Sequence, residues 1–208
     1  PENQEERSAR IVFDCPEYGR SDTVKVFQTR DHSPAIVFKD AEVKRICVEK
    51  WDHDGDGELS ETEAAAVRSL GGTFYANDKI VNFEELKFFT SLEEIEALAF
   101  SGCSKLESVS FPPYLTSISD AAFSSCSLKG ALVLPDGIKS IGKNAFESCK
   151  GITSLHLPAK LETIGEYAFN KCSSVKGSLV IPDKVTDIPT GAFQHSAFDG
   201  TLTLPPKL

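Results

Sequence analysis

The dipeptide Ala-Phe recurs five times in this sequence at nearly constant spacing. The phenylalanines of these pairs lie 23, 23, 23 and 24 residues apart, at Phe100, Phe123, Phe146, Phe169 and Phe193. A fixed period of this length predicts a solenoid, because each repeat is too small to bury its own apolar side chains and must stack on its neighbours. Such a stack presents a long ribbed surface, which favours a binding protein over an enzyme with a cleft.

Every repeat carries its apolar residues in the same order. In the third repeat these residues are Ile138, Ile141, Ala145, Phe146, Cys149, Ile152, Leu155, Leu157 and Pro158. The two-residue alternation before the proline predicts a short strand, and proline ends it. Stacked strands would form a parallel sheet, with the five phenylalanines as a buried aromatic spine.

Composition excludes some classes of partner. The chain has 208 residues, with 31 acidic against 22 basic side chains and a net charge of -9, so a nucleic-acid partner is not expected. No apolar run reaches the roughly 18 residues of a membrane span. The chain begins at Pro1 and has no methionine, so we expect an excised or processed piece.

Two alternating segments near the N-terminus, 9–13 and 23–28, predict a β-hairpin, with a turn through Pro16 and Gly19. A lone hairpin is marginal in water, so it should pack on other structure. The sequence of residues 6–11 and 24–28 resembles the last two strands of a BACON domain. That family is an immunoglobulin-like module common in secreted and surface proteins of gut bacteria.

Residues 36–90 change to helical spacing, with Asp40 as the N-cap of a helix that ends near Trp51. The following segment, residues 52–63, fits the EF-hand calcium-loop template, with Gly57 at the sharp bend. Ca²⁺ prefers six to eight oxygen ligands, and we expect this acidic loop to supply them. The predicted ligands are the carboxylates of Asp52, Asp54, Asp56 and Glu63, the carbonyl of Glu58, and Ser60 through water.

Two other interpretations of this segment stay open. The acidic loop could simply cap the helix expected over residues 61–70. A second loop would place Phe74, Ala76 and Asp78 at liganding positions, which cannot hold calcium well. The 22-residue offset between the two loops also resembles the paired repeats of dockerins, an assembly module.

The repeat residues resemble the BspA-like leucine-rich repeats, a family of bacterial surface proteins. We predict an α/β fold: a β-hairpin remnant over residues 1–35, an EF-hand-like helical cap over 36–91, and a leucine-rich repeat solenoid of parallel short strands over 92–208. The module before such repeats in gut bacterial members looks like residues 36–90, and its last helix would cap the open end of the solenoid. The resemblance implies adhesion and host-protein binding at the cell surface.

Four cysteines, Cys103, Cys126, Cys149 and Cys172, share one phase of the repeat. Side chains in such a parallel array point the wrong way to bridge, so we predict a reduced, buried ladder. Cys15 and Cys47 could pair if the hairpin packs on the first helix. A nucleophilic couple of Cys172 and His195 would need an exposed thiol, so we expect no enzyme.

Side chains between the inward apolar positions of each strand should point outward. The candidate ligand-binding residues are Ser110, Val133, His156, Val180 and Thr203, here called the exposed row. We expect an extracellular or outer-surface, monomeric protein that binds a host or bacterial surface protein or glycan, without a membrane span of its own. The alternatives are a spacer that presents a distal carbohydrate-binding or enzymatic domain, or a dockerin-like module.

Overall fold

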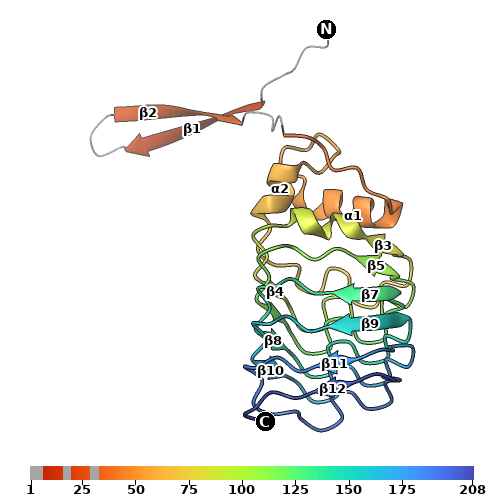
Figure 1. Ribbon diagram of the computed structural model, residues 1–208. Helices are drawn as coiled ribbons and strands as arrows, with labels where there is room; N and C mark the ends of the chain where they lie inside the picture. Colours follow the sequence, from red (N-terminus) through yellow and green to blue (C-terminus); the bar gives the residue numbers. More distant parts are fainter. Residues whose placement is uncertain (1–6, 16–19, 29–32) are drawn as a thin grey trace.

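The computed structural model describes residues 7–15, 20–28 and 33–208, with side chains described from Ser33 onward (Figure 1). Strands β1 (Arg7–Cys15) and β2 (Arg20–Gln28) pair antiparallel in full register, which confirms the predicted hairpin. The predicted turn through Pro16 and Gly19 lies outside the described residues. The assignment of this hairpin to a BACON-like module stays a prediction.

Helix α1 (Ala41–Trp51) begins where the sequence predicts it to begin. The Asp40 carboxylate caps it by accepting hydrogen bonds from the backbone N–H groups of Glu42 and Val43. Helix α2 (Glu61–Ala66) is shorter than the expected 61–70, because the chain turns to an extended conformation at the β-branched Val67. A 3₁₀ helix, η2 (Glu84–Phe88), replaces the helix that was expected to close this segment.

Ten short strands, together with η2, build the repeat solenoid in Figure 1. They are β3 (Asn82–Phe83), β4 (Glu94–Ile95), β5 (Ser108–Val109), β6 (Ser117–Ile118), β7 (Gly130–Val133), β8 (Ser140–Ile141), β9 (Ile152–His156), β10 (Thr163–Ile164), β11 (Leu179–Val180) and β12 (Leu202–Thr203). On one side, β4, β6, β8 and β10 form a continuous parallel sheet in that spatial order. On the other side, the strands pair only as β3–β5, β7–β9 and β11–β12, each pair parallel.

A stack of phenylalanine rings runs through the core, as the Ala-Phe period predicts. Adjacent rings lie 5.0–5.5 Å apart between centroids, with interplanar angles of 2–14°. This ring stack consists of Phe74, Phe100, Phe123, Phe146, Phe169 and Phe193. It begins one repeat earlier than the Ala-Phe pattern indicates, because Thr73 stands where alanine precedes phenylalanine elsewhere.

The backbone explains why the pair is Ala-Phe. The N–H of Phe146 donates to the carbonyl of Ala168 in the next coil at 2.8 Å, and Phe123 donates to Ala145 in the same way. The alanine side chains are fully buried, so this position must be small. In the five coils from Phe100 to Phe193, the residues two before and two after the phenylalanine adopt positive φ, such as Asn144 (φ 56°) and Ser148 (φ 61°). Coil-to-coil hydrogen bonds hold these left-handed residues in place.

Helix α1, rather than the last helical segment, covers the first ring of the stack. Its buried side chains include Val43, Ile46 and Cys47. The Trp51 ring at its end lies 6.3 Å from Phe74 and 5.4 Å from Phe89. A solenoid otherwise exposes apolar surface at its first coil, so this helix acts as the N-terminal cap.

Candidate functional site

The acidic loop lies between α1 and α2, where the chain folds back on itself. An antiparallel bridge joins Ala35 to Ser60, and the N–H of Ile36 donates to the carbonyl of Leu59 at 2.8 Å. Gly55 (φ 72°) and Gly57 (φ 88°) have positive φ, which allows the tight turn that the template requires. The loop is therefore anchored at both ends to the cap.

Three of the predicted ligands come together in this loop. One carboxylate oxygen each from Asp52, Asp54 and Glu63 lies within 4.8 Å of the other two. Two oxygens bound to one Ca²⁺ at about 2.3–2.6 Å can be at most about 4.6–5.2 Å apart, so this group fits a single ion. Glu63 is buried, whereas the two aspartates are half exposed. The donor set, all hard carboxylate oxygens, suits calcium.

The other predicted ligands lie outside that group of three carboxylates. The Asp56 carboxylate accepts a hydrogen bond from the N–H of Glu58 at 2.8 Å. The Glu58 side chain forms an ion pair with Lys44 of α1 at 2.7 Å, so its predicted role is left to its carbonyl. The Ser60 hydroxyl donates to Glu63 at 2.9 Å and accepts from the Glu63 N–H, which is a capping box at the start of α2.

These contacts do not show an EF-hand. Glu63 accepts hydrogen bonds from the N–H groups of His53 and Ser60, at 2.7 and 2.9 Å, so the loop is also held by its own backbone. The following helix has six residues only. The position considered for a second loop, Phe74, is a fully buried member of the ring stack. This placement removes the paired-loop interpretation on which a dockerin-like module depends.

The side of the solenoid that carries β3, β5, β7, β9, β11 and β12 is here called the strand face. The exposed row lies on this face, as predicted. Val133 is 75% exposed and Val180 is 52% exposed, and His156 and Thr203 are also exposed, whereas Ser110 is half buried. Within each strand pair the row is in register, with Val133 opposite His156 and Val180 opposite Thr203. These four residues nevertheless belong to two separate strand pairs, and Ser110 directly follows β5 of a third pair.

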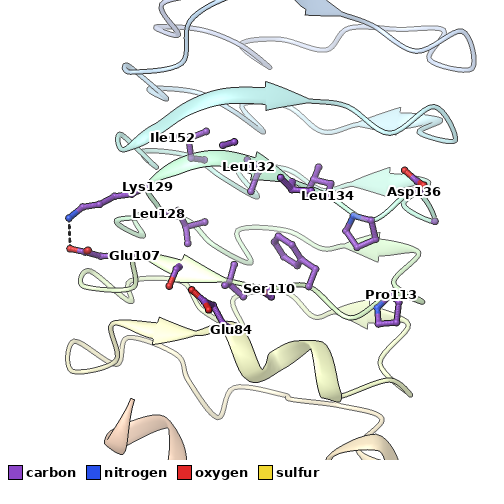
Figure 2. Close-up of a pocket in the computed structure, with 17 residues that line it drawn as sticks. Glu84, Glu107, Ser110, Pro113, Leu128, Lys129, Leu132, Leu134, Asp136 and Ile152 are labelled. Atoms are coloured by element: carbon purple, nitrogen blue, oxygen red, sulfur yellow. Dashed lines mark hydrogen bonds and ion pairs between the residues drawn. The ribbon is translucent and has the colours of Figure 1, made fainter. Parts of the chain in front are cut away.

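A groove of about 630 Å³ opens on this face between β5 and β7, where the strands do not pair (Figure 2). One backbone hydrogen bond joins the two coils there, from the Lys129 N–H to the Glu107 carbonyl at 2.9 Å. Gly130 (φ 79°) begins β7, and a register shift follows it. Apolar side chains form much of the lining, and the charged residues Glu84, Glu107, Lys129 and Asp136 lie at its edges in Figure 2, here called the rim.

Sequence reasoning missed this groove, and a local irregularity in the repeat does not account for it. Leu128 follows Cys126 by two residues, whereas Leu106 and Ile152 follow their cysteines by three. This spacing does not by itself predict an unpaired strand, because Ser196 and Phe198 have it where β11 and β12 pair, and β9 and β11 fail to pair without it. The predicted parallel sheet is therefore correct within each strand pair and wrong as a continuous sheet on this face.

The cysteine ladder is reduced and buried, as predicted. Each thiol donates to the carbonyl of the phenylalanine one coil earlier: Cys149 to Phe123 at 3.1 Å, and Cys172 to Phe146 at 3.3 Å. Burial raises the pKa of the Cys172 thiol to about 12. The thiolate that a couple with His195 would need is therefore not formed at neutral pH. Cys47 is also a free, buried thiol.

Comparison with known proteins identifies similar repeats. A family model described as BspA type leucine-rich repeat region matches residues 71–198, with six copies. The crystal structure of a Treponema pallidum leucine-rich repeat protein is 27% identical over 67% of this chain and 63% of its own, with a TM-score of 0.56. A Bacteroides ovatus leucine-rich repeat protein is 21% identical over 98% of this chain and 53% of its own, also with a TM-score of 0.56.

This chain therefore spans less than two thirds of the length of either solved structure. Among curated proteins, no sequence matches. Within the described ranges of the chain, no helix is both long and apolar enough to cross a membrane.

Proposed function

The chain belongs to the BspA-type leucine-rich repeat family, and on this premise we propose that it is a non-enzymatic, surface-type binding protein that recognises a protein or glycan through its strand face. One observation carries the proposal. The exposed row presents the uncharged side chains of Val133 and Val180, and it stands on coils whose interior is packed by the buried ring stack. Exposed apolar side chains that gather on one face mark interaction sites.

The chemistry of the row supports contact with a partner more than mere solvation. Val133 and His156 lie side by side on β7 and β9, and Val180 and Thr203 do so on β11 and β12. Branched apolar and small hydroxyl side chains lose little conformational entropy when a partner covers them. An extracellular or outer-surface location accompanies this proposal, because the family it rests on is typically found at the cell surface.

A retention experiment tests the function. The purified chain is immobilised and exposed to host-cell surface extracts and to a glycan array, in parallel with variants Val133→Glu, His156→Ala and Val180→Glu. We expect retained ligands, and weaker retention by the variants whose side chains touch the ligand. A spacer that only presents another domain would retain nothing above background, and unchanged binding by all three variants would rule out the exposed row.

We also propose that calcium stabilises the N-terminal cap through Asp52, Asp54 and Glu63. Three carboxylates this close together repel one another, and a divalent cation would neutralise that repulsion. The ion would contribute charge and coordination only, joining α1 to the start of α2. Single sites of this kind in extracellular modules bind with dissociation constants near 10⁻⁴–10⁻³ M, which suits a structural ion.

Thermal melting in millimolar calcium, in magnesium and in chelator tests whether calcium stabilises the cap. With a dissociation constant of 10⁻⁴–10⁻³ M, calcium at about 10 mM should raise stability by about 1.4–2.7 kcal/mol, which should appear as a higher melting temperature. Glu63→Gln is the informative variant, because glutamine can keep the capping box while removing the charge. We expect it to fold and to lose the calcium response. The same melting temperature in calcium and in chelator would overturn the site.

A further inference from the structure

We propose that the groove between β5 and β7 binds an extended peptide segment in which an apolar residue stands next to lysine or arginine. This inference rests on the proposed binding function and names the partner class for one part of the strand face. Three features of the groove carry it: two strand edges that do not pair, an apolar floor and an acidic rim.

The unpaired strands favour a peptide main chain as the occupant. β5 pairs with β3 and β7 pairs with β9, and one backbone hydrogen bond, between Lys129 and Glu107, crosses the interval between β5 and β7. Buried or half-buried backbone groups need hydrogen-bond partners, which water supplies here in the absence of a ligand. An extended peptide carries N–H and C=O groups along its length and can replace that water, as in other complexes where a peptide lies along a strand.

The floor of the groove suits an apolar side chain of such a peptide. Val109 and Phe111 of the earlier coil and Leu132 and Leu134 of the later one line the groove, and the exposed Val133 lines it as well. Phe111 is the one aromatic residue in the lining, and it is half buried in a T-shaped contact with Phe123 at 5.6 Å. It therefore offers little of the open ring platform on which a sugar could stack, and the groove favours a peptide over a glycan.

Charge at the rim selects the flanking residue of the ligand. The rim has three carboxylates, Glu84, Glu107 and Asp136, against the single ammonium of Lys129. Glu107 pairs with Lys129 and Glu84 pairs with Lys39, but Asp136 is exposed and has no ion pair among the residues from Ser33 onward. A lysine or arginine beside the apolar anchor would pair with Asp136, and a carboxylate there would be repelled.

Selection from a library of short random peptides on the immobilised chain tests the inference. We expect enrichment of sequences with lysine or arginine adjacent to leucine, isoleucine or valine. Individual enriched peptides are then measured by fluorescence anisotropy against two groove variants, Val133→Arg and Asp136→Lys. Val133→Arg should weaken binding by about tenfold or more, and Asp136→Lys should weaken it several-fold and reverse the preference from basic to acidic peptides.

The fourth repeat supplies matched controls, because Val180 and Asp183 occupy the same phase as Val133 and Asp136 without lining the groove. Val180→Arg and Asp183→Lys should bind the enriched peptides within about twofold of the parent chain. Thermal melting followed by circular dichroism checks that all four variants fold. We expect them to fold, because each substituted side chain is exposed.

Several results would overturn the inference. These are no enriched peptides, enrichment of acidic peptides, or equal losses in the groove variants and their controls. If proteins or glycans are retained through Val180 while no peptide binds the groove, the proposed binding function stands and the peptide inference falls. If nothing is retained in either experiment, both fall.

Discussion

The two long sides of the solenoid differ in how strictly they repeat. On the side of the ring stack, each coil places a phenylalanine on the previous one with almost the same spacing, and β4, β6, β8 and β10 form one unbroken sheet. On the strand face, the pairing is interrupted twice and the outward residues change in every coil. Stacking between neighbouring coils on the regular side stabilises the solenoid. The outward residues of the strand face can therefore vary from coil to coil.

Removal of one ring should have the largest effect of the changes considered. Phe146→Ala deletes a fully buried ring that stacks on two neighbours, each at 5.4 Å. The lost burial and the resulting cavity should lower the free energy of unfolding by about 3–5 kcal/mol, measured by urea denaturation. Val133→Ala on the strand face is the control, with an expected change within about 0.5 kcal/mol. Similar losses in the two variants would contradict the division of roles between the two sides.

A methyl group added between coils of the regular side should come next. In Gly165→Ala, the new Cβ would lie 2.3 Å from the backbone nitrogen of Lys143 and 2.4 Å from the carbonyl carbon of Gly142. Because backbone atoms cannot move aside as a flexible side chain can, we expect a loss of about 1–3 kcal/mol in the same assay. Gly72→Ala meets no atom within 4 Å and should leave stability unchanged or slightly raised. Tolerance of alanine at position 165 would show that the coils can separate.

Alkaline pH should weaken the regular side through its thiols. Burial raises the pKa of Cys172 from 9.0 to about 12 in the folded chain. Below pH 9 both states keep the proton; between pH 9 and 12 the unfolded chain loses it while the folded chain retains it. Stability should therefore fall by up to about 1.4 kcal/mol per pH unit for this thiol in that window. Urea midpoints measured across the window should fall less steeply for Cys172→Ala, and an unchanged slope would refute the assignment.

The smallest effect should come from the ion pairs between coils. Lys143 pairs with Glu166 on the regular side, and Lys129 pairs with Glu107 across the interval between β5 and β7. All four side chains are largely exposed, so solvent screens both pairs. We expect neither Lys143→Ala nor Lys129→Ala to shift the unfolding midpoint measurably. A clear shift for Lys129→Ala alone would show that this pair holds the groove together.

Much of the fold follows from local pattern. The Ala-Phe period predicts the ring stack, and Asp40 predicts the start of α1, because a fixed repeat and a capping carboxylate act over short stretches of chain. The sixth ring was missed, because Phe74 has a threonine before it and resembled part of a second loop. The end of α2 at Ala66 was also missed, because a helix boundary depends on what the next residues contact. There, the N–H of Leu70 donates to the carboxylate of Glu96.

The candidate sites divide in the same way. The acidic loop could be read from consecutive residues, although the sequence could not show that Glu58 would pair with Lys44. The outward direction of Val133 and Val180 followed from strand alternation. The groove could not be predicted, because it depends on two strands from different coils failing to pair.

By itself, the sequence determined the solenoid, its buried phenylalanines and reduced cysteines, and the face that points to solvent, since all of these follow from periodic burial within each repeat. Only the tertiary structure decided where the first coil lies, which helix covers it, and where the strand face opens. Those features depend on contacts between coils, which join residues far apart in the chain and are not set by the pattern within a single repeat.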